Sequence, residues 1–180
     1  MHAAVCDYIS DLVQNAIEAE SSLIQLDVYT GAEAIRIRIS DNGKGMSSAT
    51  LSKALDPFYS EAGKHDHRRV GLGLPLLYQT AEAVNGSVEI ESTPGQGTVV
   101  SFTFDAAHID TPPLGDLPLT VVGLMTFDAE FNLEFRRTTA NDQYQISRAE
   151  LVETLGNLQE SANFKLVRDF LQSQEEDLAQ

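Results

Sequence analysis

Two polar side chains near the start of the sequence have the types and the spacing to bind a phosphorylated ligand. Asp11 and Asn15 are four residues apart in a segment of helical periodicity, so they should share one face of a helix. An amide oxygen such as that of Asn15 is a suitable hard ligand for Mg²⁺ between phosphates, and Asp11 could orient or deprotonate a nucleophile. The alternative interpretation is a solvated polar face on an ordinary helix.

A second group, the sequence DNGKGM at residues 41–46, follows a run of alternating apolar and polar residues. Asp41 has the same parity as the isoleucines before it, so its carboxylate should point towards the buried side of a strand. A buried carboxylate needs hydrogen-bond donors, and the amino group of adenine would supply one. Gly43 and Gly45 let the backbone approach a flat base closely. Met46, the last residue of the group, is also expected to contact the nucleotide. The same residues are also good turn formers, which is the alternative.

A third group consists of Gly71, Leu72, Gly73 and Leu74. It stands just before a helical pattern, where small residues let backbone amides converge at the positive end of the helix dipole, as in a phosphate cradle. The preceding loop carries cations that could pair with phosphates, namely Lys64, Arg68 and Arg69. The spacing matches neither the Rossmann fingerprint nor the Walker pattern.

In this order the three groups resemble the ATPase domain shared by DNA gyrase, the heat-shock chaperones, sensor histidine kinases and the mismatch-repair protein MutL, the GHKL superfamily. The resemblance covers about residues 5–104, and the sequence DPFY at residues 56–59 with a short lid makes it closest to the histidine-kinase branch. It implies that Asn15 binds Mg²⁺, that Asp41 binds adenine and that Thr98 contacts the phosphates or this aspartate. The family often has a glutamate as catalytic base where this chain has the shorter Asp11.

The fold that the resemblance implies is an α/β two-layer sandwich, with helices packed on one face of a mixed β-sheet (the Bergerat-type ATP-binding fold). The residue pattern places helices at 5–20, 47–55 and 74–85, the second capped by Ser47 and the third ended by Gly86. Alternation places strands at 23–29 and 34–40, joined as an antiparallel hairpin, and at 88–91 and 99–104. Residues 58–70 are predicted to form a polar loop.

The sequence changes character near residues 110–115, so we expect a histidine-kinase-like ATP-binding domain at 1–108 and a second segment at 109–180. In that segment the patterns predict a hairpin of strands 119–127 and 133–138. Ser147 and Glu150 have the spacing of a capping box before a helix, and a second helix is predicted at 163–173, with 174–180 frayed. Its apolar faces suit partner binding or a homodimer through residues 111–180.

The chain has 180 residues, 42% of them hydrophobic, and a formal net charge of −15. So acidic a surface repels nucleic acid and anionic membranes, and neither is expected as a partner. The single cysteine, Cys6, excludes an intrachain disulfide and is expected to be a small apolar contact. His65 and His67 lack further clustered ligands and are expected to be solvated. The sequence shows neither a signal-peptide pattern nor a membrane-spanning apolar run, so a cytoplasmic protein is expected.

These features predict a signalling module that binds ATP and Mg²⁺. A sensor kinase carries its phosphoacceptor histidine on a hairpin before the ATP domain, and the helix with Asn15 starts too near residue 1 for that hairpin. The prediction is therefore a stand-alone histidine-kinase-like or anti-sigma-like protein kinase that acts on a separate protein. Two alternatives are an ATP-sensing interaction module without significant turnover and a scaffold domain that has lost the nucleotide. The family's strand before the Asn15 helix is also missing, so the fold tolerates its loss, another segment replaces it, or the chain is truncated.

Overall fold

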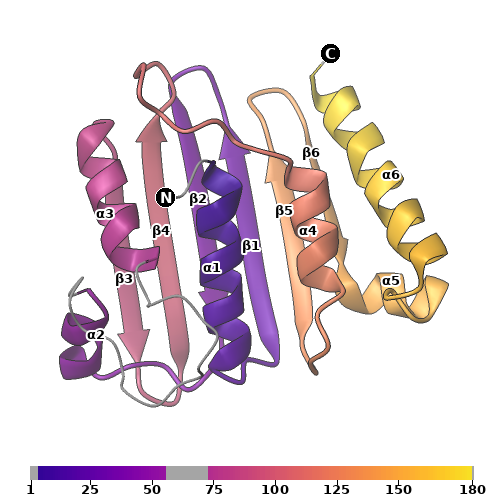
Figure 1. The fold of residues 1–180 in the computed structure, drawn as a ribbon, viewed down its shortest axis with the longest axis horizontal. Helices are drawn as coiled ribbons and strands as arrows, with labels where there is room; N and C mark the ends of the chain where they lie inside the picture. The colour runs from indigo at the N-terminus through magenta and orange to yellow at the C-terminus, as the bar shows by residue number, and fades with distance from the viewer. Residues whose placement is uncertain (1–3, 56–72, 180) are drawn as a thin grey trace.

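One mixed β-sheet of six strands runs through both halves of the chain in the computed structural model, which describes residues 4–55 and 73–179. In the order in which they lie side by side, its strands are β3 (Ser87–Thr93), β4 (Gly97–Asp105), β2 (Ala34–Asp41), β1 (Leu23–Thr30), β5 (Asn132–Thr138) and β6 (Gln143–Ser147). Figure 1 shows α1 (Val5–Glu18), α3 (Gly73–Ala83), α4 (Leu117–Met125) and α6 (Ser161–Leu178) on one face of this sheet. The predicted two-layer sandwich is confirmed. Two shorter helices are α2 (Ser48–Ala54) and α5 (Arg148–Leu155).

The alternation of apolar and polar residues decides which face of the sheet the helices cover. In β2, Ile37 and Ile39 are buried against the helices, whereas Arg36 and Arg38 are exposed on the other face. β1 pairs with β2 antiparallel, with Val28 beside Ile37, so the predicted hairpin is confirmed. β3 and β4 form a second antiparallel pair.

Helix α1 lies on the helix-covered face of the sheet and contacts both β4 and α3. The ring of Tyr8 meets Phe102 and Phe104 of β4 edge-on, with centroids 6.3 and 6.1 Å away. Its hydroxyl is 2.6 Å from Oγ1 of Thr80 on α3, so the two helices are also linked by a hydrogen bond. Cys6 is 5% exposed, as expected for an apolar contact, and its burial raises the pKa of the thiol to about 11.

Helix α3 ends at a residue other than the predicted cap. Gly86 does not take the left-handed conformation, which belongs instead to Asn85 with φ 55°. The N–H of Gly86 donates to the carbonyl of Ala81 at 2.7 Å. A Cβ at Gly86 would lie only 2.1 Å from the carbonyl oxygen of Thr103, so this glycine is needed for the close approach of the helix end to β4.

The prediction of a strand at 119–127 is wrong, because this run forms α4. Its apolar residues are buried on almost every side, between α1 and α6, and show no polar stripe from which a helical period could be recognised. The signals for a helix stand at its start. Oδ1 of Asp116 accepts the N–H of Leu119 at 2.9 Å as an N-cap, and Pro118 occupies the first turn.

The predicted strand at 133–138 is β5, but its hairpin partner is β6. β5 pairs antiparallel with β6, with Phe135 beside Ile146, and parallel with β1, with Phe135 beside Leu26. The edge of β1 that β2 leaves unpaired is therefore occupied by a strand from the C-terminal half. This arrangement favours the alternative in which another segment supplies the strand that is missing before α1.

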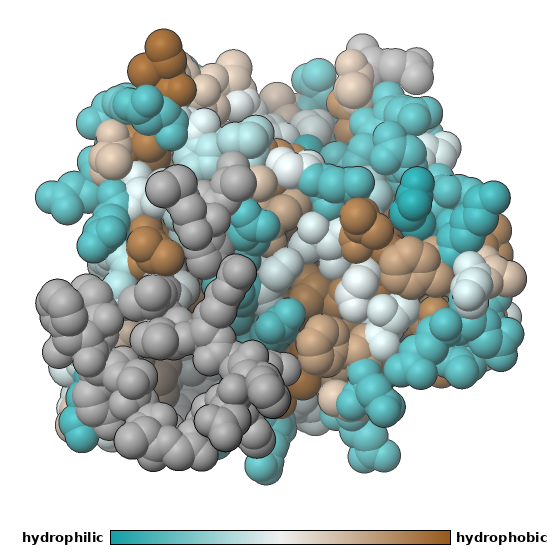
Figure 2. All heavy atoms as spheres, in the orientation of Figure 1, coloured by the Kyte–Doolittle hydropathy of each residue, from teal (hydrophilic) through white to brown (hydrophobic). Residues whose placement is uncertain are grey.

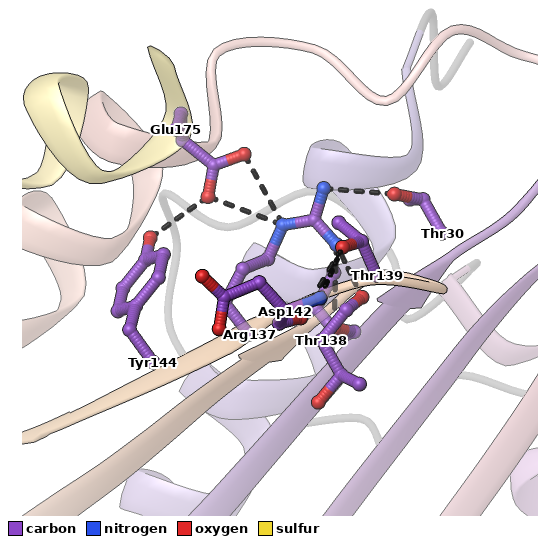
Figure 3. Close-up of polar contacts among 8 residues, drawn as sticks. Thr30, Arg137, Thr138, Thr139, Asp142, Tyr144 and Glu175 are labelled. Atoms are coloured by element: carbon purple, nitrogen blue, oxygen red, sulfur yellow. Dashed lines mark hydrogen bonds and ion pairs between the residues drawn. The ribbon is translucent and has the colours of Figure 1, made fainter. Parts of the chain in front are cut away.

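A buried ion pair between Arg137 and Glu175 links α6 to the sheet (Figure 3). Arg137 of β5 is 4% exposed, and its Nε donates to both carboxylate oxygens of Glu175 on α6, at 3.1 Å each. Its other nitrogens donate to Oγ1 of Thr30 at 2.8 Å and to backbone carbonyls. Glu175 also accepts the hydroxyl of Tyr144 at 2.8 Å. These bonds satisfy both charges, as a buried ion pair requires.

The same contacts correct the prediction that residues 174–180 fray. α6 continues to Leu178, because Glu175 in its last turns is held on the sheet. The predicted capping box is confirmed: Ser147 Oγ accepts the N–H of Glu150, and Glu150 accepts the N–H of Ser147, both at 3.2 Å. No helix in the described part of the chain is long and apolar enough to cross a membrane.

We expect Glu175→Ala to lower the free energy of unfolding by about 3 kcal/mol, because it leaves the guanidinium of Arg137 buried without its carboxylate. Urea unfolding followed by circular dichroism measures the loss. Glu176→Ala, at an exposed position of the same helix, is the matched control and should change stability by less than about 0.5 kcal/mol. Equal effects of the two substitutions would show that the buried pair does not hold α6.

Candidate nucleotide-binding site

Three polar side chains form a row across the ends of neighbouring strands. Asp41 at the end of β2 pairs with Thr98 of β4, and Thr98 pairs with Ser92 of β3. On its other side Asp41 pairs with Ile24 of β1, which is fully buried. Because paired residues of a sheet project to the same face, the Asp41 side chain lies on the helix-covered face, as its parity predicts.

The carboxylate of Asp41 receives two hydrogen bonds, and both reach the same oxygen. Oγ of Ser21 donates to Oδ1 at 3.0 Å, and the N–H of Gly43 donates to Oδ1 at 2.8 Å. Among the described residues, none donates a hydrogen bond to Oδ2. A partly buried carboxylate oxygen needs a donor, so Oδ2 suits the amino group of a ligand.

The turn after Asp41 is tied to the start of β1 by Asn42. Its Oδ1 accepts the backbone N–H groups of Ser22 and Leu23, at 3.0 Å each. Its Nδ2 donates to Oγ of Ser22 at 2.9 Å. With three bonds to one short segment, Asn42 keeps the turn in place beside the carboxylate.

Two glycines let this turn lie directly against the turn between β3 and β4. Gly45 has φ 60° and Gly97 has φ 106°, in the left-handed region that favours glycine. A Cβ at Gly45 would lie 2.0 Å from the carbonyl oxygen of Thr93, and one at Gly97 would lie 1.9 Å from that of Asp41. The two turns are therefore packed backbone to backbone, without room for a side chain at either glycine.

Ser92 connects Met46 with Thr98. Oγ of Ser92 accepts the N–H of Met46 at 2.8 Å and lies 2.8 Å from Oγ1 of Thr98. Met46 and Thr98 are both half-buried. The carboxylate of Asp41 and the hydroxyl of Thr98 can hydrogen-bond to the polar edge of a heterocyclic base. The side chain of Met46 can contact its apolar face.

Helix α1 carries Asp11, which is half-buried, and Asn15, which is exposed one turn later. α3 begins beside Asp11, because a Cβ at Gly73 would lie 3.2 Å from its Oδ2. Leu74 is half-buried in the first turn of α3. The structure thus brings together the first predicted group and the described part of the third.

Several predicted residues lie outside the described part of the chain. They are Arg69, Gly71 and Leu72, together with Lys64, His65, His67, Arg68 and the DPFY sequence at 56–59. Their predicted roles stay predictions.

The sequence patterns missed two hydroxyl groups, those of Ser21 and Ser92. Ser92 alternates with Val88 and Ile90 on the inner side of β3, so strand parity was a signal that could have found it. Ser21 lies between α1 and β1, where neither the helical nor the strand period applies, and no pattern marks it.

Within residues 4–55 and 73–179, no group of three or more His, Cys, Asp or Glu side chains could hold a metal ion alone. A Mg²⁺ at Asn15 would therefore need ligands from beyond these ranges, for which phosphate oxygens and water are suitable. Mg²⁺ commonly binds in this way, since it keeps several waters and needs few protein ligands. The donor set of this chain is compatible with such an ion.

Comparison with known proteins agrees with this geometry. Residues 3–108, more than half of the chain, match the family described as histidine kinase-, DNA gyrase B-, and HSP90-like ATPase. The chain belongs to this family, so it carries an ATP-binding domain of the kind found in signalling histidine kinases.

Individual relatives are proteins much longer than the shared part. The chain is 31% identical over 100 residues to sensor histidine kinase YxdK of Bacillus subtilis, with 53% of this chain and 31% of the relative covered. It is 34% identical over 113 residues to the cell-division control histidine kinase PdhS of Brucella ovis (55% and 11% covered). It is 30% identical over 117 residues to the non-motile and phage-resistance protein of Caulobacter vibrioides (61% and 14% covered). The chain thus spans less than a third of the length of each of these relatives.

We expect Gly97→Ala to destabilise the protein much more than Gly95→Ala. Both glycines have positive φ, 106° and 74°, so a side chain costs about 1–2 kcal/mol at either through its conformation alone. Only at Gly97 would the new Cβ also meet a carbonyl, since nothing lies within 4 Å at Gly95. Thermal unfolding compares the two variants. Equal losses would contradict the backbone-to-backbone packing of the two turns.

Proposed function

We propose that this chain is a cytoplasmic signalling module that binds ATP with Mg²⁺ and passes the γ-phosphate to a separate protein, as a histidine-kinase-like or anti-sigma-like kinase. The observation that carries the proposal is the Asp41 carboxylate, held by two donors on Oδ1 with Oδ2 left for the ligand. Membership of the ATPase family supports the nucleotide, and the named sensor and cell-division histidine kinases among its relatives support phosphate transfer.

In this proposal Asp41 recognises the base. An ionised carboxylate only accepts hydrogen bonds, so Oδ2 favours adenine, which presents an amino group, over a base that presents a carbonyl. The hydroxyl of Thr98, directly opposite in the sheet, can bridge to the same edge of the base through water. Gly43, Gly45 and Met46 lie in the turn that would face its ring.

Asn15 and Asp11 would act at the phosphate end. A Mg²⁺ ion held here would supply positive charge to offset the negative charge that develops on the phosphates during transfer. The side-chain oxygen of Asn15 is the ligand that this chain supplies, and its exposed position on α1 keeps it accessible. Asp11 would accept the proton of the attacking group.

The start of α3 would bind the phosphates themselves. Gly73 opens this helix, where the first N–H groups lack intrahelical partners and the dipole favours an anion. We extend the same role to Arg69, Gly71, Leu72 and Leu74, the residues around it in the sequence. The guanidinium of Arg69 and the backbone amides of the others would bind phosphate, although the net charge of the chain is −15.

A second candidate function is an ATP-sensing interaction module without significant turnover. The contact between Asp11 and the start of α3 favours it, because a carboxylate at that helix end is a group that phosphate would displace or repel. Binding of the nucleotide would then change the position of the adjoining segment, and a partner would detect the change.

A homodimer through residues 111–180 is part of the proposal. Figure 2 shows hydrophobic side chains gathered on the helical face of the molecule over α4 and beside α6. Leu166 and Phe170 of α6 are 55% and 47% exposed, and Leu119 of α4 is 44% exposed. Exposed apolar groups of this size favour an interface with another protein surface.

We expect Asp41→Asn to raise the Kd for ATP with Mg²⁺ at least tenfold, since it removes a charged hydrogen-bond acceptor worth about 1.5–3 kcal/mol. Isothermal titration calorimetry measures the change. Asp27→Asn, on the uncovered face of the sheet, removes the same charge away from the site and should leave the Kd within twofold. A wild-type protein that is folded but binds no ATP at millimolar concentration would contradict the proposal.

We expect Asp11→Asn to lower transfer of the γ-phosphate by about 10²–10⁴-fold while ATP affinity stays nearly unchanged, as for the loss of a general base. γ-Labelled ATP reports both labelling of a partner protein and release of phosphate. Wild-type protein that binds ATP but neither labels a protein nor releases phosphate would favour the sensing module. Turnover that persists in the variant would show that Asp11 is not the base.

A further inference from the structure

Ser21 is the buried hydroxyl of the site. It is 2% exposed, and with Arg137 it is one of two buried polar or charged residues recorded in the described part of the chain. Burying a hydroxyl is unfavourable unless it is hydrogen-bonded. Ser21 meets this requirement by donating to Oδ1 of Asp41 at 3.0 Å, so the carboxylate is the partner that satisfies the buried hydroxyl.

The two donors on Oδ1 restrict the carboxylate. The terminal torsion of an aspartate is broad and roughly two-fold, so a carboxylate with one donor can rotate or exchange its oxygens. Ser21 approaches Oδ1 from the α1–β1 connection, and the N–H of Gly43 approaches it from the turn after β2. Donors from two separate segments define one orientation, and they leave Oδ2 as the acceptor for the ligand.

Ser21 also links this orientation to helix α1. Its own N–H donates to the carbonyl of Ala16 at 3.3 Å, one residue beyond Asn15. A Cβ at Gly43 would lie 2.5 Å from Oγ of Ser21, so the hydroxyl fills the space between the end of the helix and the turn. The backbone and side chain of Ser21 therefore link the helix that carries Asn15 to the carboxylate that receives the base, beside a second link in which the N–H of Lys44 donates to the carbonyl of Ala19 at 3.0 Å.

We propose that Ser21 is a positioning residue for base selection: it holds Asp41 so that Oδ2 meets the exocyclic amino group of adenine. This inference rests on the proposed function, because it concerns the same nucleotide site. A residue that acts only by holding the acceptor should strengthen binding of nucleotides with the amino group and leave unchanged those without it.

Calorimetry of wild type and Ser21→Ala with Mg²⁺ tests the inference, using ATP and purine riboside triphosphate, which lacks the amino group. We expect the wild type to prefer ATP. In Ser21→Ala the Kd for ATP should rise about five- to tenfold, the loss of one typical hydrogen bond, while the Kd for the analogue stays within twofold. The preference for ATP should shrink by the same factor.

Ser22→Ala is the matched control. It removes a neighbouring hydroxyl that bonds to Asn42 on the same turn and makes no bond to Asp41, so the preference for ATP should be kept. Ser21→Cys keeps the shape with a slightly larger atom and a weaker donor, and should give a smaller loss of preference. This variant provides the measurement if Ser21→Ala does not fold.

The outcomes separate the two levels of the proposal. Equal losses of affinity for ATP and the analogue would show that Ser21 only supports the turn. Unchanged affinities for both nucleotides would show that Ser21 has no role, and either result overturns the inference. A wild type that binds both nucleotides equally would overturn base recognition by Asp41. A wild type that binds neither would overturn the proposed function, and this inference with it.

Discussion

The pairing of β1 on both of its edges is the constraint on which the rest of the structure depends. β1 takes β2 on one side, antiparallel, and β5 on the other, parallel. A parallel neighbour cannot be joined by a tight turn, and here most of the chain, including α3 and α4, lies between the two strands. The C-terminal half therefore enters the same sheet whose opposite side carries the Asp41 row. Without β5, one edge of β1 would have no hydrogen-bonding partner strand. The side chains of Leu26 and Val28 would also lose their neighbours Phe135 and Arg137.

Arginine side chains join segments of the C-terminal half of this acidic chain. In a chain of net charge −15, two arginines are used inside the C-terminal half and not at the nucleotide site. Arg137 joins β5 to α6, and Arg148 donates to the carbonyls of Met125 and Phe131 where α4 leads into β5. The two bonds of Arg148 satisfy carbonyl groups at the end of α4 and in the segment before β5. In the proposed function, charge at the phosphates would instead be offset by Mg²⁺, by the start of α3 and by cations near it in the sequence.

Much of the backbone structure around the site could be predicted, because it depends on the strand and helix periods of neighbouring residues. The parity of Asp41 with Ile37 and Ile39 predicted its face correctly, and the helical spacing placed Asp11 and Asn15 on one helix face. Predictions failed where a helix is buried on most sides and so shows no alternation of apolar and polar residues. They also failed where a contact joins segments far apart in the sequence. The apolar run of α4 has no polar stripe, Glu175 is fixed by a strand far away in sequence, and Ser21 acts through a carboxylate twenty positions further on.

The sequence by itself determined the α/β class, the strands and helices of the first hundred or so residues, and the order of three groups typical of a nucleotide site. Those features are local, since each depends on residues within a few positions of one another. Only the tertiary structure decided that β5 lies parallel to β1, that α6 is held by a buried ion pair, and that Ser21 and Gly43 share one oxygen of Asp41. These pairings join segments far apart along the chain, and their free energy comes from burial and hydrogen bonding that exist only once the chain has folded.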